Sequence, residues 1–294
     1  MGLDINSVRF LIAARKQGAE LGDALMLGRQ DLNVYPAKMR EALAEAGLPN
    51  ELFAPEAKDT GFAEPVFKSL GARNVWSLDA SAFEGAEFVH DLNKPIGAEL
   101  REKFDLVYDG GTLEHVFNFP VALQNCMEML RVGGRLFIHT VTNSYCGHGF
   151  YQFSPELFWR ALSPENGFTV ERMVLHRMGP YGRWYEVADP NAIQARVELV
   201  TLAPVQLLIQ ARRTKVVPVF ATVPQQSDYT PRWTEKGVET DHPAAQINYA
   251  PARPGLAKLL PGGARLLHVV KMAWALWRSH SLGNRKCFWP VNKK

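Results

Sequence analysis

Short apolar runs, each bounded by turn-forming residues, recur along the first two thirds of this 294-residue chain. Segments in which apolar residues follow a helical period lie between them. This alternation constrains the fold strongly, because consecutive parallel strands need crossover connections long enough to hold a helix. It predicts an α/β fold whose sheet has helices on both faces, with strands at 24–27, 74–78, 87–90, 104–108, 135–141 and 169–176.

The sequence beyond the sixth predicted strand indicates a mixed sheet. Two extended-looking runs, 196–201 and 205–212, are separated by Pro204, which favours an antiparallel hairpin that closes the sheet. Between the fourth and fifth strands, residues 123–130 follow a helical period, and the pair Gly133 and Gly134 is expected to end this helix. We therefore predict a mostly parallel sheet with an antiparallel closing strand.

Composition excludes several classes of protein. With 47% hydrophobic residues the chain can bury a sizeable core, yet it has no stretch of about 18 uncharged apolar residues. The N-terminal segment lacks an apolar run followed by a small-residue cleavage site, so we expect a cytoplasmic location. Cys126, Cys146 and Cys287 are spaced too widely for paired ligands, so the cysteines predict neither a disulfide framework nor a metal site.

Charge is distributed unevenly along the chain. Residues 251–294 hold nine Lys or Arg and no acid, although the net charge of the whole chain is only +3. Residues 218–261 are rich in proline and weakly patterned. We therefore predict one α/β domain over 1–217, with an insertion at about 34–72, followed by a Pro-rich arm and a basic C-terminal helix over 218–294.

The basic helix is predicted from the polar residues Arg265, His268, Lys271 and Arg278, which recur on one stripe among apolar positions. An amphipathic helix over 264–280 could dock on the preceding domain, dock on another subunit, or lie on an anionic membrane surface. We favour docking, because apolar helix faces are usually buried against protein. Nucleic acid is not expected as a partner, because the rest of the chain has an excess of acids and no recognised motif.

Three carboxylates follow directly after predicted strands. Asp79 ends the second strand, Asp91 the third and Asp109 the fourth. Ligands of open α/β sheets lie beyond the carboxyl ends of the strands, so these residues are candidates for a binding site. Asp79 suits a ribose, because its two oxygens can accept from both hydroxyl groups. The alternative is that each acid caps the turn or helix that follows it.

A longer motif surrounds Asp109: FDLVYDGGTLEHV (104–116), then a helix, then LRVGGRLFIHT (130–140). It resembles the fourth and fifth strand region of class I, or Rossmann-like, methyltransferases, which use S-adenosylmethionine. Downstream, GHGFYQFSPELFWRAL (147–162) and NGFTVERMVLH (166–176) are similar to the family's substrate loop, the helix after it and the sixth strand. The resemblance covers roughly residues 20–215 by the order of elements and is close over 104–176. It implies a Rossmann-like mixed sheet and a methyltransferase.

The chain departs from this family at the first strand. There the family has an acidic residue and a Gly-x-Gly loop, which lets the backbone approach the cofactor closely. The corresponding segment here is DALMLGRQDLN (23–33), in which only Gly28 could serve as such a glycine, and Arg29 and Gln30 replace small residues. Either the side chain of Arg29 or Gln30 replaces the backbone contacts, or cofactor binding has been lost. We favour the first alternative because the acids after the next strands are present.

The resemblance implies that the strand ends bind S-adenosylmethionine. A pair of glycines after the fourth strand suits this role on physical grounds as well, because a ligand can lie against backbone that has no Cβ. The candidate cofactor residues are Gly28 and Arg29, Asp79 and Ala80 at the ribose, Asp91 and Leu92 at the adenine, and Asp109, Gly110 and Gly111 at the methionine end.

Histidines near the same strand ends are candidate bases. Methyl transfer from a sulfonium requires alignment and, for some acceptors, a group that takes the acceptor's proton. His115, His139 and His148 follow or end the fourth and fifth strands, and imidazole titrates near neutral pH. His148, in a Gly-His-Gly loop, is the first candidate, and His115, from the family's Glu-His pair, is the second. The aromatic-rich segment 145–159 around the loop could line an acceptor pocket or pack in the core.

The sequence therefore supports one leading function and two alternatives. The leading hypothesis is S-adenosylmethionine-dependent methylation of an oxygen on a small-molecule or glycan acceptor. The second is a catalytically inactive relative that acts as a binding or scaffold protein, because the glycine loop is eroded. The third is a nicotinamide-dependent oxidoreductase, whose pyrophosphate would need a glycine-rich helix start that this sequence lacks.

Overall fold

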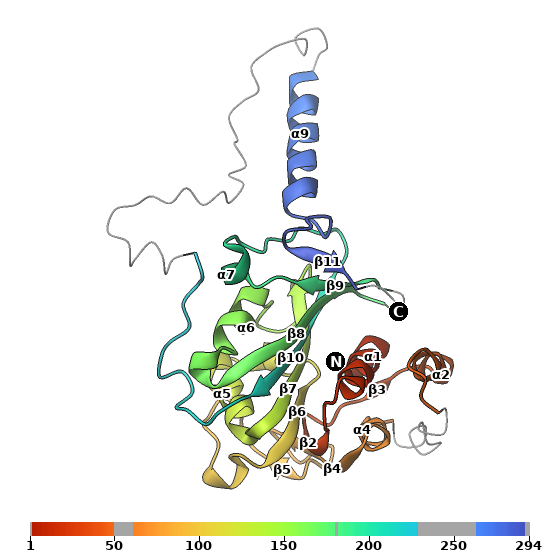
Figure 1. Ribbon diagram of the computed structural model, residues 1–294, viewed down its shortest axis with the longest axis vertical. Coiled ribbons are helices and arrows are strands. Elements are labelled where there is room, and N and C mark those ends of the chain that lie inside the picture. Colours follow the sequence, from red (N-terminus) through yellow and green to blue (C-terminus); the bar gives the residue numbers. More distant parts are fainter. Residues whose placement is uncertain (1, 50–60, 180–181, 229–262, 292–294) are drawn as a thin grey trace.

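The computed structural model describes residues 2–49, 61–179, 182–228 and 263–291. Within these ranges a nine-stranded sheet forms the centre of the molecule, and a two-stranded parallel sheet of β1 (Leu3–Asp4) and β3 (Leu32–Asn33) lies beside it (Figure 1). In spatial order the nine strands are β11 (Phe288–Pro290), β9 (Trp184–Val187), β8 (Phe168–Arg177), β10 (Val205–Arg213), β7 (Leu130–Asn143), β6 (Phe104–Asp109), β2 (Gly22–Leu27), β4 (Ala72–Asp79) and β5 (Phe88–Val89).

The large sheet has a parallel body and an antiparallel insertion. Strands β7, β6, β2, β4 and β5 pair in parallel, whereas β10 runs antiparallel to both of its neighbours, β7 and β8. The predicted mixed sheet is therefore confirmed. Strands β9 and β11, which extend the β8 edge by antiparallel pairing, were not predicted.

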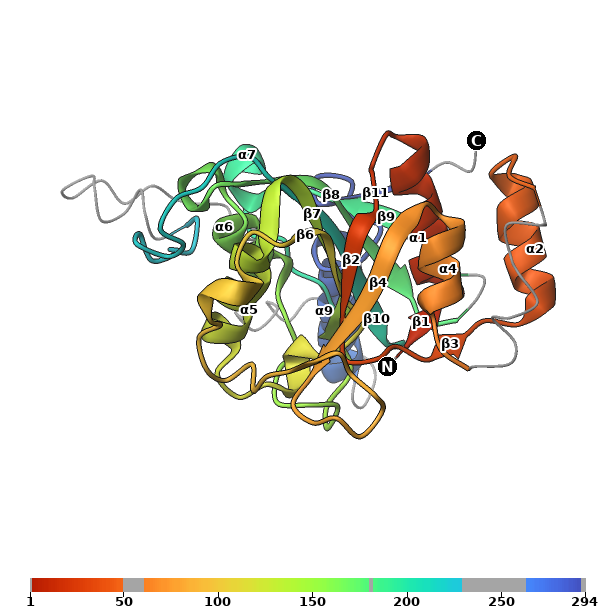
Figure 2. The same ribbon diagram turned by 90° about the horizontal axis from the view of Figure 1, so that it is seen from below.

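Helices cover both faces of this sheet, as predicted (Figure 2). Those labelled α1, α2 and α4 lie on one side, and α5 and α6 on the other. Ser154 caps α6, since its side chain accepts from the backbone N–H of Glu156, and Pro155 occupies the first turn. The helices of the described residues are α1 (Ile5–Lys16), α2 (Pro36–Glu45), α4 (Glu64–Ser69), α5 (Phe119–Met129), α6 (Pro155–Ala161), α7 (Pro190–Ile193) and α9 (Gly263–Ser279), with 3-10 turns η2 (Ala98–Leu100), η3 (Leu113–His115) and η4 (Pro164–Asn166).

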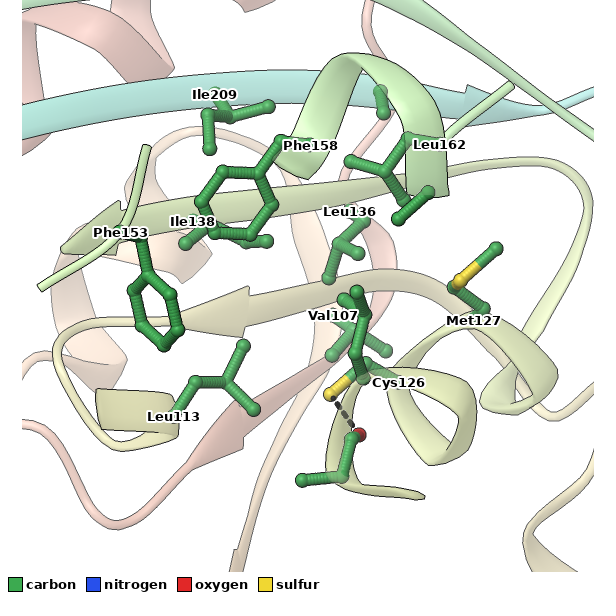
Figure 3. Close-up of a cluster of buried hydrophobic side chains, with 14 of the residues drawn as sticks. Val107, Leu113, Cys126, Met127, Leu136, Ile138, Phe153, Phe158, Leu162 and Ile209 are labelled. Atoms are coloured by element: carbon green, nitrogen blue, oxygen red, sulfur yellow. Dashed lines mark hydrogen bonds between the residues drawn. The ribbon is translucent and has the colours of Figure 1, made fainter. Parts of the chain in front are cut away.

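Alternating side chains of the strands divide the core into two layers. In β2, Leu25 and Leu27 pack with the layer under α5 and α6, whereas Ala24 and Met26 pack with the layer under α1 and α4. This is the period of two that a strand buried on both faces requires. Figure 3 shows part of the first layer, where Phe158 of α6 and Cys126 of α5 lie over side chains of β6, β7 and β10.

The prediction of a closing hairpin is wrong for one of its two strands. Strand β10 confirms the run 205–212, but residues 196–201 form no strand. The reason is that β10 is hydrogen-bonded on one side to β7 and on the other to β8, so no edge is left for a hairpin partner. Residues 196–201 instead run along the C-terminal segment, where the N–H of Val200 donates to the carbonyl of His280 over 2.6 Å.

The predicted end of the helix before β7 is also wrong. Helix α5 ends at Met129, and β7 already begins at Leu130, which pairs with Phe104 of β6. Tertiary pairing of the buried Leu130 therefore overrides its helical spacing in the sequence. Gly133, with φ of +90°, lies inside the strand, where the pairing register with β6 shifts.

Helix α9 confirms the predicted C-terminal helix and projects away from the sheet in Figure 1. Val269, Val270, Trp274 and Trp277 are exposed, so docking of this face on the preceding domain is not what the structure shows. The residues after the helix do pack on the domain, since Leu282, Cys287 and Phe288 are buried. No helix in the described ranges combines the length and apolarity needed to cross a membrane.

Candidate cofactor and acceptor site

The carboxyl ends of β2, β4 and β6 meet at one edge of the sheet. Leu27 of β2 lies opposite Leu78 of β4 on one side and Asp109 of β6 on the other. From β2 the chain continues to β4 on one side of the sheet, and from β6 it continues to β7 on the opposite side. The direction of the connections therefore reverses between β2 and β6. Open α/β sheets bind ligands in the crevice at such a reversal. The predicted location of the site therefore exists in the fold.

Gly28 lies in the middle of this edge. Its φ is +70°, and its N–H donates to the carbonyl of Leu78 over 2.7 Å. A Cβ built on Gly28 would lie 3.4 Å from Oγ1 of Thr112 and 3.7 Å from Oδ2 of Asp79. The positive φ favours glycine, and the missing side chain leaves space between a hydroxyl and a carboxylate. The structure thus brings Gly28 and Asp79 together, and adds Thr112, which the sequence analysis missed.

The two oxygens of the Asp79 carboxylate differ in their contacts. Oδ1 accepts from the N–H of Ser81 over 3.2 Å, whereas Oδ2, the oxygen near Gly28, makes no hydrogen bond within the part of the chain that the structure describes. Asp79 is half-buried, and Ala80 after it is exposed. An accessible carboxylate at the end of the strand next to β2 is the arrangement predicted for a ribose. The contact with the ribose itself stays a prediction.

Arg29 does not fill the space beside Gly28. Its Nε pairs with Oε1 of Glu64 at 2.6 Å, its Nη1 donates to the carbonyl of Glu84 over 2.9 Å, and its guanidinium lies 3.9 Å from the centre of the Phe62 ring. These contacts direct Arg29 toward α4 and the loop after β4. A direct contact of Arg29 with the cofactor stays a prediction.

Gln30 turns inward instead and is buried. Its Nε2 donates to the carbonyl of Leu27 over 2.5 Å, while its Oε1 is buried and has no hydrogen-bond partner among the described residues. A Cβ on Gly110 would lie only 2.1 Å from this oxygen, so Gln30 packs directly against the glycine after β6. The large residue in the eroded loop is therefore accommodated by the absence of a side chain at Gly110.

Asp91 and Leu92 follow β5 at the edge of the sheet. Oδ1 of Asp91 accepts from the backbone and side chain of Asn93, and Oδ2 pairs with Nζ of Lys94 at 3.4 Å. The hydrogen bonds from Asn93 and the nearby Lys94 charge lower the pKa of Asp91. Leu92 is buried in the core beneath α5. Whether this pair flanks an adenine stays a prediction.

Asp109 is completely buried, and its carboxylate is used inside the protein. Oδ1 accepts from the N–H groups of Thr112 and Leu113 at 2.8 and 3.3 Å, which starts η3. Burial, and next the nearby Glu114 carboxylate, raise the pKa of Asp109. Of the three acids after strands, this one performs the alternative role of a cap. Contact of the methionine end with residues 109–111 stays a prediction. Asp79 and Asp91, unlike Asp109, are only half-buried.

Glu114, His115 and His148 form a cluster a few residues beyond this turn. One ligand atom from each lies within 4.8 Å of the others, and the two imidazole rings are 5.2 Å apart between centroids. Glu114 is fully buried, and its Oε2 accepts from Oγ1 of Thr140 on β7 over 2.9 Å. Burial raises the pKa of Glu114, and partial desolvation lowers the pKa of His115. The two predicted histidines therefore lie together, and Glu114 is a member of the site that the sequence analysis did not single out.

The loop after β7 is held against η3 by its backbone. The N–H groups of Phe150 and Tyr151 donate to the carbonyl of Glu114 over 2.8 and 3.3 Å. Gly149, with φ of +76°, makes this approach possible, because a Cβ there would lie 2.7 Å from the Glu114 carbonyl oxygen. The Gly-His-Gly loop is thus docked by specific contacts, which place His148 beside Glu114.

The aromatic segment divides between core and surface. Phe153 and Phe158 are buried and pack with Phe119 of α5, so core packing accounts for them. Phe150 is exposed and meets the exposed Phe117 edge to face, with 5.7 Å between ring centres. This exposed pair lies adjacent in sequence to the Glu114 cluster, and the half-buried ring of Tyr145 lies 5.7 Å from that of His148.

A second group of histidines is buried between α1 and the sheet. Oγ of Ser7 lies 2.6 Å from Nδ1 of His139, whose Nε2 lies 3.3 Å from Nε2 of His176. Asp4 accepts from both the N–H and the hydroxyl of Ser7 and caps α1. Nδ1 of His176 lies 3.0 Å from the carbonyl of Arg177, which can only accept, so this nitrogen carries the proton. His139 is therefore part of a buried polar chain and not of the acceptor site.

This buried group of polar side chains makes the stability of the folded protein depend on pH in the acid range. Burial, followed by the nearby His139 charge, lowers the pKa of His176 from 6.5 to about 4. Between these two values the unfolded chain binds a proton that the folded chain does not, so the free energy of unfolding decreases as the pH falls, by up to about 1.4 kcal/mol per pH unit. Urea unfolding from pH 7 to pH 4 measures this slope. A His176→Asn variant should show a shallower slope, and an unchanged slope would contradict the assignment.

The sheet order identifies the fold. Numbered along the chain, its body follows the doubly wound order 3-2-1-4-5-6 in strands β5, β4, β2, β6, β7 and β8, with the antiparallel β10 inserted before the last. The chain has a Rossmann-like fold. No family model matches this sequence. A curated relative, the mitochondrial ubiquinone biosynthesis O-methyltransferase of Rattus norvegicus, is 31% identical over 127 residues, which cover 34% of this chain and 36% of that protein. The match therefore spans about a third of the length of that relative.

Solved structures of methyltransferases are similar to this chain in the course of the backbone. One is a putative methyltransferase of Bacillus halodurans, with 12% identity, a TM-score of 0.37, and coverage of 69% of this chain and 99% of that one. Another is the 1,6-didemethyltoxoflavin-N1-methyltransferase of Burkholderia thailandensis, solved with S-adenosylhomocysteine, with 16% identity, a TM-score of 0.38, and coverage of 71% and 78%.

Proposed function

We propose that this protein is an S-adenosylmethionine-dependent methyltransferase that methylates an oxygen of a small-molecule or glycan acceptor. One observation carries the proposal: at the reversal point of the sheet, Oδ2 of Asp79, which has no hydrogen-bond partner among the described residues, flanks Gly28. The cluster of Glu114, His115 and His148 follows the ends of β6 and β7. The name of the rat relative, an O-methyltransferase, supports oxygen as the acceptor atom.

The residues at the strand ends fit the cofactor. Asp79 offers ribose hydroxyls an oxygen that has no hydrogen-bond partner in the described part of the chain, and the absent side chain at Gly28 leaves room beside it. In this proposal Asp91 and Leu92 lie by the adenine, and the backbone of residues 109–111 by the methionine portion. When bound, S-adenosylmethionine supplies a methyl group on an already activated sulfur leaving group, so the protein chiefly has to align the acceptor.

The histidine cluster is the proposed acceptor side of the site. His115 is exposed and has a lowered pKa, so its imidazole is neutral at physiological pH and able to interact with an acceptor hydroxyl. His148 faces the buried Glu114 carboxylate at 3.8 Å. The exposed rings of Phe117 and Phe150 offer an apolar surface for the acceptor beside it.

Isothermal titration of S-adenosylmethionine and S-adenosylhomocysteine into the protein tests this function. We expect both to bind with a stoichiometry of one per chain. If neither compound bound, the proposed activity would be overturned. That result would favour the alternative of an inactive scaffold protein, which needs no cofactor.

We further propose that α9 places the enzyme on an anionic membrane surface, at the cytoplasmic side. Val270, Trp274 and Trp277 recur at helical spacing and are exposed, Trp277 by 66%. Lys271 is exposed beside them, and the guanidinium of Arg278 lies 5.3 Å from the Trp274 ring. The absence of acids from residues 251–294 favours an anionic lipid surface as the occupant of this face.

Vesicle sedimentation tests the membrane contact. The protein should sediment with vesicles that contain phosphatidylserine, and less with neutral phosphatidylcholine vesicles or at high salt. Replacing both Trp274 and Trp277 by serine should release it, whereas replacing the exposed Phe83, on the loop after β4, should not. A dimer that forms through α9 without vesicles, and loses its stability with the same substitutions, would contradict the proposal.

A further inference from the structure

One oxygen of the buried Glu114 carboxylate lacks a hydrogen bond. Thr140 donates to Oε2, but Oε1 has no partner within the described residues. The nearest facing group is Nε2 of His148, which is also buried and also unpaired. The two atoms are 3.8 Å apart, which is too long for a hydrogen bond. Since unpaired polar atoms are costly inside proteins, two of them facing each other indicate a missing partner between them.

The spacing of the cluster suits a metal ion. Two ligand atoms on one tetrahedral zinc ion, each about 2.0–2.1 Å from it, lie about 3.4 Å apart. The Glu114 and His148 atoms are 3.8 Å apart, and the ligand atom of His115 completes a set within 4.8 Å. A cation between them would neutralise the buried carboxylate and satisfy both unpaired atoms.

We propose that Glu114, His115 and His148 bind a divalent metal ion such as Zn²⁺. Two imidazoles and one carboxylate form a donor set typical of zinc sites that keep one position open, whereas magnesium and calcium prefer oxygen ligands alone. His115 is exposed, so the open position faces solvent. The consequence for catalysis rests on the proposed function: the open position would take the acceptor's oxygen and lower its pKa.

Neighbouring residues hold the three ligands in place. Thr140 orients the carboxylate from β7, and the backbone of the loop after β7 is hydrogen-bonded to Glu114. Such supporting contacts fix ligand geometry at metal sites. Gly149 is the most sensitive of them, because a Cβ there would meet the Glu114 carbonyl oxygen at 2.7 Å and Nδ1 of His115 at 3.2 Å. The cysteine spacing could not indicate this site, because none of its ligands is a cysteine.

Binding of Co²⁺ to the metal-stripped full-length protein tests the site without any measurement of activity. We expect a visible absorption band that saturates at one Co²⁺ per chain and disappears when Zn²⁺ is added. Glu114→Gln and His148→Ala should each weaken Co²⁺ binding by at least about tenfold, the size of effect seen even when a ligand loses its hydrogen-bond partner. Gly149→Ala should weaken it while leaving all three ligands present. His90→Ala, outside the cluster, is the matched control and should bind as the wild type does.

The same variants separate this proposal from the proposed function. Glu114→Gln and His148→Ala should still bind S-adenosylhomocysteine, and Asp79→Ala should still bind Co²⁺. A wild-type protein that gives no band in excess Co²⁺, or two ligand variants that both bind like the wild type, would overturn the metal site even if the cofactor binds. Because His148 lies in a loop, its alanine variant keeps the test valid should Glu114→Gln fail to fold.

Discussion

Replacing Asp79 by alanine is expected to weaken the binding of S-adenosylhomocysteine by about 10–100-fold, since hydrogen bonds to a charged group contribute about 1.5–3 kcal/mol. The physical reason is that Oδ2 of Asp79, the oxygen beside Gly28, has no hydrogen-bond partner among the described residues and is free to accept from a ribose. Isothermal titration measures the change in affinity, and methyl transfer at low cofactor concentration should fall in parallel.

Two further variants make this test specific. Asp79→Asn keeps one acceptor oxygen and should lose less affinity than the alanine variant. Glu84→Ala, on the exposed loop after β4, removes a nearby acidic side chain and should bind as the wild type does. If Asp79→Ala bound S-adenosylhomocysteine with wild-type affinity, Asp79 would have no role at the ribose and the assignment of the cleft would be wrong.

Replacing Asp109 by alanine should destabilise the protein by about 2–4 kcal/mol, because two backbone N–H groups at the start of η3 would lose their acceptor, each at a cost of about 1–3 kcal/mol. These donors belong to Thr112 and Leu113, and the site is fully buried. Asp109→Asn retains an acceptor oxygen and is expected to cost much less. Urea unfolding of the two variants and the wild type gives the comparison.

The dependence on pH distinguishes this explanation from a simple packing defect. Burial raises the folded-state pKa of Asp109 above its ordinary value of 3.8, so above about pH 4 the folded chain holds a proton that the unfolded chain releases. The contribution of Asp109 to stability therefore decreases as the pH rises through this range. Relative to the wild type, Asp109→Asn should gain stability between pH 5 and pH 8. A difference that stays constant over this range would contradict the raised pKa.

These two acids show how one sequence pattern leads to different roles. Both Asp79 and Asp109 directly end a strand of the parallel body, and the sequence offers the same two interpretations for each, ligand or cap. In the structure Asp109 is enclosed by η3 and the neighbouring strands, and its Oδ1 accepts from two backbone donors, while its Oδ2 is buried and has no hydrogen-bond partner among the described residues. Asp79 lies next to β5, a strand of only two residues, and keeps an accessible oxygen. Burial, which depends on distant segments, separates the two cases.

The contacts of Arg29 and Gln30 explain how the fold accommodates large residues in place of the loop's missing glycines. Arg29 points away from Gly28 and pairs with Glu64, and Gln30 packs against Gly110 at the neighbouring strand end. From the sequence, either Arg29 or Gln30 could replace the lost backbone contacts, because both are long polar side chains beside Gly28, and Arg29 was the candidate cofactor residue. Their opposite directions depend on partners more than 30 positions away along the chain.

Local pattern alone determined the parallel body of this sheet and the helices on its faces. Alternation of apolar residues and the spacing of turn residues are properties of neighbouring positions, so they predicted six strands and the α9 helix. Only the tertiary structure decided which strand pairs with which, and thereby why residues 196–201 form no strand beside β10. It also decided that Glu114 meets His115 and His148, because a loop after β7 docks on the turn after β6. Such contacts are stabilised by residues that are far apart in the sequence, and a pattern of neighbouring residues carries no information about them.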